Sequence, residues 1–171
     1  MTRALIPLAN GVEEMEAVII IDVLRRAKWE VVSAGVGRQL ITASRHVELV
    51  ADLEWHKIRP HSFDVLVIPG GAEGVKNLIA NREVLNAVSD HVKAGKLIGA
   101  VCAGPLVLQA AGVLDEREAT CHPGVRSEMT GAILRNERVV IDGKIVTSQA
   151  AGTCFEFALT LVRLVEGKKA A

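Results

Sequence analysis

The sequence contains no tyrosine, and aromatic residues make up only 3% of its 171 residues. A core of normal size must therefore be built from valine, leucine, isoleucine and alanine, which supply most of the hydrophobic half of the composition. The chain also lacks an excess of charge, because 20 basic residues balance 20 acidic ones. A neutral chain gives no electrostatic reason to expect a specific nucleic acid or an anionic membrane as a partner.

Long apolar runs and paired cysteines are missing as well. No run reaches the length of about 18 residues that a membrane-spanning helix needs, and the N-terminus is unlike a signal peptide because acidic residues follow its short apolar part directly. The three cysteines are odd in number and lack C-x-x-C spacing. We therefore expect a cytoplasmic protein with free thiols, no disulfide framework and no metal.

Strand-like and helix-like segments alternate along the chain, with no internal repeat or linker. Short apolar runs ended by glycine or proline predict buried strands, and apolar residues three and four positions apart predict helices. The predicted strands cover residues 3–9, 29–36, 39–44, 46–52, 63–71, 96–101 and a hairpin over 138–148; the predicted helices cover 12–27, 81–96, 105–112 and 153–167. This alternation predicts one α/β domain over residues 1–171, a doubly wound sandwich with a mostly parallel sheet.

Three predicted strands end in segments that are candidates for chemistry. The first ends at Asn10-Gly11, just before an acidic cluster, the second at Gly70-Gly71, and the third at Cys102. Sites in open α/β sheets lie at the carboxyl ends of the strands. We therefore expect these three ends to form one site.

Cys102 stands where a predicted strand meets a helix, in the segment AVCAG at residues 100–104. The small residues on both sides resemble the nucleophile elbow, G-x-S-x-G. We expect the N-terminus of the following helix to lower the pKa of the thiol, and the backbone amides of Cys102 and Gly71 to form an oxyanion hole. A buried cysteine with only a packing role is the alternative, and the spacing alone leaves both open.

A carboxyl and an imidazole are candidate partners of this thiol. Glu13, Glu14 and Glu16 open a predicted helix, where acidic side chains favour the helix dipole. Glu16 adjoins an apolar helical stretch, and a carboxyl buried there would have a raised pKa and could hydrogen-bond a thiolate while protonated. His122 follows another predicted strand and is a candidate base or proton shuttle, with a surface or capping role as the alternative.

The remaining cysteines and histidines are expected to be structural. Cys121 adjoins His122, but no third metal ligand accompanies the pair, and Cys154 opens the last predicted helix and is expected to be buried. The other histidines stand in polar or loop contexts and are expected at the surface: His46, His56, His61 and His91.

Together these motifs resemble the DJ-one/ThiJ/PfpI family, closest to the parkinsonism-associated deglycase branch and its bacterial relatives. The resemblance covers nearly the whole chain. It rests on EEME at residues 13–16, IPGG at 68–71, AVCAGP at 100–105, HP at 122–123, TS at 147–148, and GT at 152–153 followed by FEF at 155–157. It implies a flavodoxin-like three-layer sandwich that forms a homodimer.

The resemblance also implies residue roles. The reactive cysteine of the family falls on Cys102, its protonated glutamate partner on Glu16, its histidine on His122, and its oxyanion glycine on Gly71. Gly70 and Ala103 are expected to take part with Gly71 in oxyanion or substrate binding. Dimer contacts fall around Met15, and Arg45 matches an arginine that approaches the site of the partner subunit.

The activities of the family include glyoxalase chemistry without glutathione and the repair of methylglyoxal-glycated proteins and nucleotides, with no cofactor. We therefore expect an enzyme that acts through Cys102 on 2-oxoaldehydes or their adducts. A redox-sensing, chaperone-like stress protein that uses oxidation of Cys102 is the alternative. Some members are proteases, and an amidotransferase-like hydrolase would need a His-x-Glu pair that none of the five histidines supplies.

The chain also departs from the family pattern. Ala150-Ala151 replaces a common Gly-Pro, and Ala43 replaces a common cysteine. Relatives in the parkinsonism branch continue into another C-terminal helix, so we expect the rim of the pocket to differ here.

Overall fold

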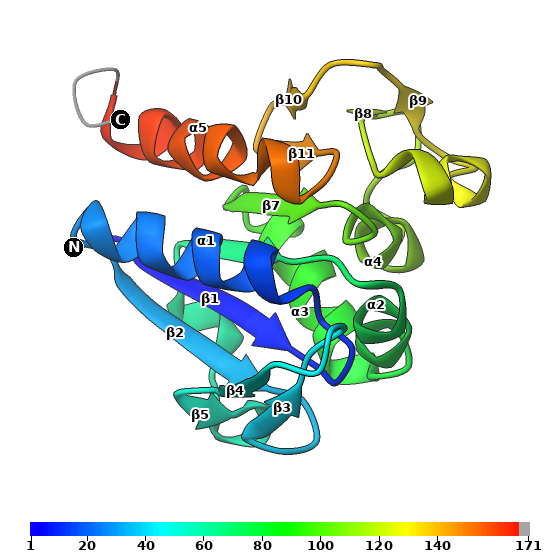
Figure 1. Ribbon diagram of the computed structural model, residues 1–171. Helices are drawn as coiled ribbons and strands as arrows, with labels where there is room; N and C mark the ends of the chain where they lie inside the picture. Colours follow the sequence, from blue (N-terminus) through cyan, green and yellow to red (C-terminus); the bar gives the residue numbers. More distant parts are fainter. Residues whose placement is uncertain (168–171) are drawn as a thin grey trace.

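The computed structural model describes residues 1–167, whose largest element is a seven-stranded sheet (Figure 1). The strand order is β10-β11-β7-β6-β1-β2-β5. All neighbours in it are parallel except β10 and β11, which form an antiparallel hairpin. The bounds are β1 Arg3–Leu8, β2 Glu30–Gly35, β5 Leu53–Glu54, β6 Val65–Ile68, β7 Leu97–Val101, β10 Val139–Asp142 and β11 Ile145–Ser148.

Helices cover both faces of this sheet (Figure 1). Helices α1 (Glu14–Arg26) and α5 (Cys154–Glu166) lie side by side on one face. Helices α2 (Ala72–Ile79), α3 (Arg82–Lys93) and α4 (Pro105–Ala110) pack together on the other. The predicted three-layer α/β sandwich with a mostly parallel sheet is thereby confirmed.

Each face of the sheet has its own aliphatic core. Alternate residues of β1 point to opposite faces, so Leu5 packs with the α2–α4 layer while Ala4 and Ile6 pack with the α1–α5 layer. The central strand β6 is buried along its whole length, as expected for a parallel strand covered on both faces. Full burial of one large aliphatic side chain contributes roughly 1.5–3 kcal/mol. The few aromatic residues join these mainly aliphatic cores, Trp55 and Phe63 on one face of the sheet and Trp29 and Phe157 on the other.

Helix α2 was absent from the sequence prediction, because a short helix that contains Gly74 and follows Gly71 shows no helical preference. The structure explains both glycines. A Cβ atom at Gly74 would lie 2.7 Å from the backbone nitrogen of Val12, so glycine allows α2 to approach the loop after β1. At Gly71, where φ is +94°, a Cβ atom would lie 2.2 Å from the carbonyl oxygen of Gly11.

Smaller elements complete the described part of the chain. The predicted pair of short strands forms the antiparallel hairpin β3 (Leu40–Thr42) and β4 (Glu48–Val50). Strands β8 (Glu118–Ala119) and β9 (Ile133–Leu134) form a separate parallel pair. Four 3-10 turns are η1 Trp55–Lys57, η2 Pro60–Ser62, η3 Pro123–Glu128 and η4 Ala151–Thr153. Within residues 1–167, no helix combines the length and the apolar character needed to span a membrane.

Candidate active site at the carboxyl edge of the sheet

The three strand ends singled out in the sequence meet at one edge of the sheet. Strands β1, β6 and β7 are adjacent in the strand order, and a cavity of about 490 Å³ opens where they end. Residues from all three ends line it, including Glu16, Gly71 and Cys102. The loop residues Ala150 and Ala151 also line it, so the departure from the family pattern at these positions lies in the cavity wall.

Cys102 directly follows β7 and adopts a left-handed backbone conformation, with φ of +62°. Residues other than glycine rarely adopt this conformation, and it occurs preferentially at functional sites. The Cys102 amide donates to the carbonyl oxygen of Ser148 at 3.0 Å, continuing the pairing of β7 with β11. That amide is therefore occupied, and the expectation that it would form an oxyanion hole is wrong.

Two other backbone amides reach the thiol. The N–H groups of Gly71 and Ala103 both hydrogen-bond the Cys102 sulfur and favour its ionised form. Gly71 is the N-cap of α2, so its amide is one of those that the helix leaves unpaired. These two amides are in the positions where they can stabilise negative charge on sulfur or on an adjacent oxygen.

Glu16 lies in the first turn of α1 and is only 1% exposed. Its Oε2 accepts a hydrogen bond of 2.8 Å from the Gly70 amide, and the carboxyl also hydrogen-bonds the Cys102 side chain. Burial raises the pKa of Glu16 to about 7, against the lowering effect of these two hydrogen bonds. The sequence-based prediction of a buried carboxyl beside the thiol agrees with this geometry.

Gly70 has no room for a side chain because it separates the two reactive groups. A Cβ atom there would lie 2.5 Å from the Cβ of Cys102 and 2.6 Å from Oε2 of Glu16. The Gly70 carbonyl also accepts a 3.0 Å hydrogen bond from the Glu13 amide. Gly70 therefore fixes the distance between the start of α1 and the end of β7.

The pKa of Cys102 is raised to about 12, first by burial and then by the negative charge of Glu16. The sequence led us to expect a lowered pKa from the terminus of α4. That expectation is not supported, because these two effects are larger than the stabilisation by the amides. The repulsive charge of Glu16 exists only when the carboxyl is ionised. A protonated Glu16 removes it and can donate a hydrogen bond to the thiolate, so the proton of Glu16 controls ionisation of the thiol.

The other two carboxylates of the acidic cluster have structural roles. Glu13 caps α1, with its Oε2 accepting a 2.7 Å hydrogen bond from the Glu16 amide. Glu14 accepts from the Ser44 hydroxyl at 2.7 Å and from the Arg45 amide at 2.8 Å. Sequence reasoning missed these two contacts of Glu14, because Ser44 and Arg45 lie 30 and 31 residues further along the chain.

His122 lines the cavity, but its imidazole accepts a hydrogen bond from a group other than the thiol. The His122 amide donates to the Cys102 carbonyl at 2.9 Å, which fixes the segment beside the thiol. Its Nδ1 accepts a 3.0 Å hydrogen bond from the Gly124 amide and caps η3. Among the described residues, no hydrogen bond joins the imidazole to the Cys102 sulfur. The geometry therefore favours the capping role over that of a proton shuttle.

Arg45 and Met15 were expected near a subunit interface. Arg45 lines the same cavity as Cys102 of its own chain. Met15 is 58% exposed on α1. A contact of Arg45 with a partner subunit stays a prediction.

The thiols differ in accessibility. All three cysteines are free, but Cys121 and Cys154 are fully buried, whereas Cys102 is half-buried. The Cys154 thiol donates to the Glu16 carbonyl oxygen at 3.7 Å, which ties α5 to the start of α1. Burial raises the pKa of Cys121 as well. Cys102 alone of the three lines the cavity.

The candidate site thus consists of a half-buried cysteine on a strained turn, a buried glutamate beside it and two glycines at the end of the neighbouring strand. The sequence pattern of the DJ-1/PfpI family matches residues 2–164. The chain belongs to the DJ-1/PfpI family. The resemblance stated from the motifs is thus confirmed over nearly the whole chain.

Individual relatives within this family agree in sequence and fold. The chain is 38% identical to a nematode protein named glutathione-independent glyoxalase DJR-1.2 (Caenorhabditis elegans), over 91% of this chain and 83% of that protein. It superposes on the crystal structure of Drosophila melanogaster DJ-1beta with a TM-score of 0.96 and 34% identity, over 99% of this chain and 92% of that one.

Some relatives are much longer. Protein DJ-1 homolog B of Arabidopsis thaliana is 41% identical over 98% of this chain, but the match spans only 39% of the plant protein. The chain therefore spans about two fifths of that relative.

Proposed function

We propose that the protein is a cysteine-dependent glyoxalase or deglycase acting on methylglyoxal-type 2-oxoaldehydes or on their adducts with proteins and nucleotides. The observation that carries this proposal is the contact between Cys102 and a buried carboxyl with a pKa of about 7, in an open cavity. A group with that pKa can both take up and release a proton at neutral pH. The name of the nematode relative supports the same chemistry.

The proposed reaction begins when the Cys102 thiolate attacks the aldehyde carbon, forming a C–S bond and a hemithioacetal. The amides of Gly71 and Ala103 stabilise the developing negative charge. Glu16 then moves a proton from the former aldehyde carbon to the neighbouring carbon through an enediol, leaving a thioester of a 2-hydroxy acid. Water cleaves the thioester, so that methylglyoxal plus water gives lactate and the free thiol.

The decisive experiment compares lactate formation from methylglyoxal by the native protein and by Cys102→Ala. We expect the variant to lose at least about 10³-fold in rate, since no other group can form the covalent intermediate. Cys121→Ala is the matched control, because this cysteine is buried outside the cavity, and it should retain activity. Equal lactate formation by the native protein and Cys102→Ala would exclude the proposal.

A second proposal is that oxidation of Cys102 makes the protein a redox sensor with a chaperone-like role. The accessibility of this thiol alone among the three, and the two amides directed at its sulfur, favour it. An anionic sulfinate would accept hydrogen bonds from these amides and from protonated Glu16. Mass spectrometry after mild peroxide treatment tests this: we expect a sulfinate at Cys102, and equal oxidation of Cys121 and Cys154 would contradict it.

We further propose that the chain forms a homodimer through α1 and α5, within a reducing, cytoplasmic environment where its three thiols stay free. Both helices expose large apolar side chains: Met15 at 58%, Val18 at 50%, Phe155 at 60% and Leu159 at 42%. A second copy would cover this surface. The double variant Met15→Glu, Phe155→Glu should sediment as a monomer, whereas Ile133→Glu, an exposed apolar residue on β9, should not change the mass.

A further inference from the structure

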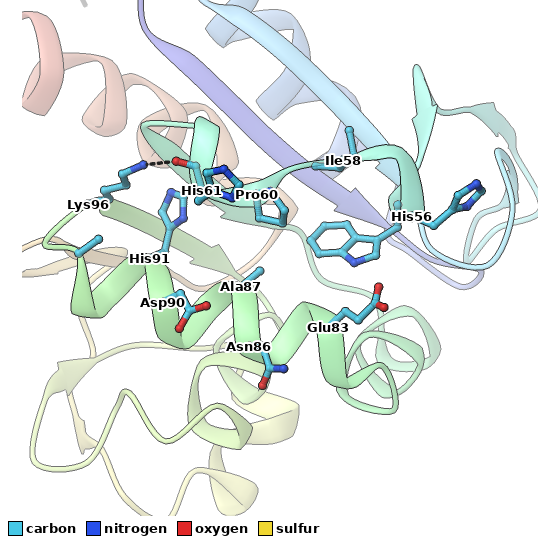
Figure 2. Close-up of a pocket in the computed structure, with 12 residues that line it drawn as sticks. His56, Ile58, Pro60, His61, Glu83, Asn86, Ala87, Asp90, His91 and Lys96 are labelled. Carbon is cyan, nitrogen blue, oxygen red and sulfur yellow. Dashed lines mark hydrogen bonds between the residues drawn. The ribbon is translucent and has the colours of Figure 1, made fainter.

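A second cavity, of about 440 Å³, lies between α3 and the chain segment that contains η1 and η2 (Figure 2). It shares no lining residue with the cavity around Cys102. Its volume lies within the range of small-molecule binding pockets, roughly 300–1,000 Å³. Nothing in the chemistry proposed for Cys102 uses it.

One part of the cavity wall is apolar and includes an aromatic ring. Trp55, Ile58, Pro60 and Ala87 contribute to its lining. Trp55 is only 5% exposed, and among the described residues no hydrogen bond satisfies its indole N–H. A flat apolar ring would find both a packing surface and a polar group beside it here.

His91 supplies a buried polar group. It lies on α3, is 2% exposed, and its Nε2 has no hydrogen-bond partner among the described residues. The expectation that His91 lies at the surface is therefore wrong. Figure 2 shows the ring extending from α3 towards His61 and Pro60. An unpaired buried ring nitrogen costs free energy, which a hydrogen bond to a ligand would recover.

At the exposed rim of the cavity, the charges favour a cation. Glu83 and Asp90 contribute two carboxylates, both at exposed positions. Of the described residues that line it, Lys96 is the only lysine or arginine, and its ammonium already donates to the carbonyls of His61 at 2.6 Å and Phe63 at 2.7 Å. Burial, and after it the positive charge of Lys96, lower the pKa of His91 to about 4, so its ring is neutral at pH 7 and one of its nitrogens is an acceptor.

We propose that this cavity binds a small organic cation, an amine or amidine carried on a flat apolar ring. The ring packs against Trp55 and Pro60, where the indole also attracts positive charge. The N–H groups of the cation donate to the unpaired imidazole of His91. Glu83 and Asp90 balance the charge from the rim. This site is independent of Cys102 and stands whether or not the proposed enzyme activity is found.

The experiment uses benzamidine as the probe and the indole N–H resonances of the protein as the readout. The chain has two tryptophans. The Trp29 indole donates to Glu166, so it serves as the internal control. We expect benzamidine to shift the Trp55 resonance in a saturable manner and to leave Trp29 unchanged. Benzoate, with a similar ring and the opposite charge, should bind at least about tenfold more weakly. No saturable shift at Trp55, or equal binding of benzoate, would overturn the proposal.

Variants test the contributions of the walls and of the charges. Ala87→Leu fills the cavity and should abolish binding. Because that variant could fold poorly, the exposed double variant Glu83→Gln, Asp90→Asn provides a second test, with an expected weakening of about 3- to 10-fold. Glu73→Gln, which removes a carboxylate from the other cavity, is the matched control. Cys102→Ala should bind benzamidine as the native protein does; loss of binding there would contradict an independent site.

Discussion

At the residue scale, Cys102 and Glu16 titrate as a coupled pair. The stability of the Cys102 thiolate depends on whether the Glu16 carboxyl is ionised. An ionised Glu16 opposes the thiolate, whereas a protonated one donates a hydrogen bond to it. The pKa of about 7 keeps a large protonated fraction of Glu16 at neutral pH. The reactivity of the thiol therefore depends on a proton that belongs to its neighbour.

Variants of Glu16 test this dependence. Glu16→Leu removes the negative charge that raises the pKa of Cys102, so we expect this pKa to fall and alkylation of the thiol by iodoacetamide at pH 9, where Glu16 is ionised in the native protein, to quicken by about tenfold, the equivalent of ~1.4 kcal/mol. Glu16→Gln removes the same charge and keeps an N–H donor, so it should lower the thiol pKa at least as far. Alkylation as a function of pH measures both. An unchanged or higher thiol pKa in both variants would contradict a repulsive charge at Glu16.

The sequence predicted the partners of Cys102 better than their hydrogen bonds. Glu16, Ile20 and Leu24 are four residues apart along α1 and all are buried, so helical spacing identifies the glutamate as part of the buried stripe. The spacing of four and then three residues between Val84, Val88 and His91 on α3 is also helical and could have identified the buried histidine. The hydrogen bond from the Cys102 amide to Ser148 could not be predicted, because it requires β11 to lie beside β7, and the sequence does not show which strands are neighbours.

At the scale of elements, α5 packs so closely on β7 that one position must be glycine. A Cβ atom at Gly99 would lie 2.8 Å from the Phe157 ring and 3.2 Å from a methyl group of Leu161. The carboxyl end of β7 carries Cys102, so this packing also supports the position of the thiol.

We expect Gly99→Ala to destabilise the protein by about 1–3 kcal/mol, because an added methyl group overpacks this layer. Phe157→Leu in the same chain should recover part of the loss by making room. Urea unfolding measures both. Gly152→Ala is the control, because a Cβ atom there meets nothing within 4 Å and should change stability little. Equal effects at Gly99 and Gly152 would contradict the close packing.

Elements with a continuous apolar run or a clear helical period were predictable, and elements defined by their neighbours were not. Strand β6 and helix α3 belong to the first kind. Helix α2 and the two-residue strands β5, β8 and β9 belong to the second. The glycines at 71 and 74 lower the helix propensity of the α2 segment, whereas two residues show no period and the pairing of the short strands depends on distant parts of the chain. The site was nevertheless predictable in outline, since it lies where three apolar strands end.

At the scale of the whole molecule, two buried groups respond to pH in opposite directions. His91 has its pKa lowered to about 4, by burial and then by Lys96, with Asp64 opposing. Its contribution to stability is present above about pH 6.5 and is lost as the pH falls towards 4. Glu16 has its pKa raised to about 7. Its contribution is present below about pH 4.5 and is lost as the pH rises through 7.

We therefore expect the two contributions to offset each other between about pH 4.5 and 6.5, each amounting to at most ~3.5 kcal/mol at ~1.4 kcal/mol per pKa unit. His91→Leu should become more stable relative to the native protein as the pH falls, and Glu16→Gln less stable. Urea unfolding at pH 7, 5.5 and 4.5 measures this. The exposed His61→Leu serves as control, and parallel pH profiles for all four proteins would contradict the assignment.

The left-handed backbone at Cys102 has a consequence for the evolution of the chain. A residue with a Cβ atom pays about 1–2 kcal/mol in this conformation, and glycine does not. Cys102→Gly should therefore relax the turn and make the fold more robust while removing the thiol. Mutational drift towards stability would favour loss of the cysteine here, so its retention in a lineage is a signature of selection for reactivity.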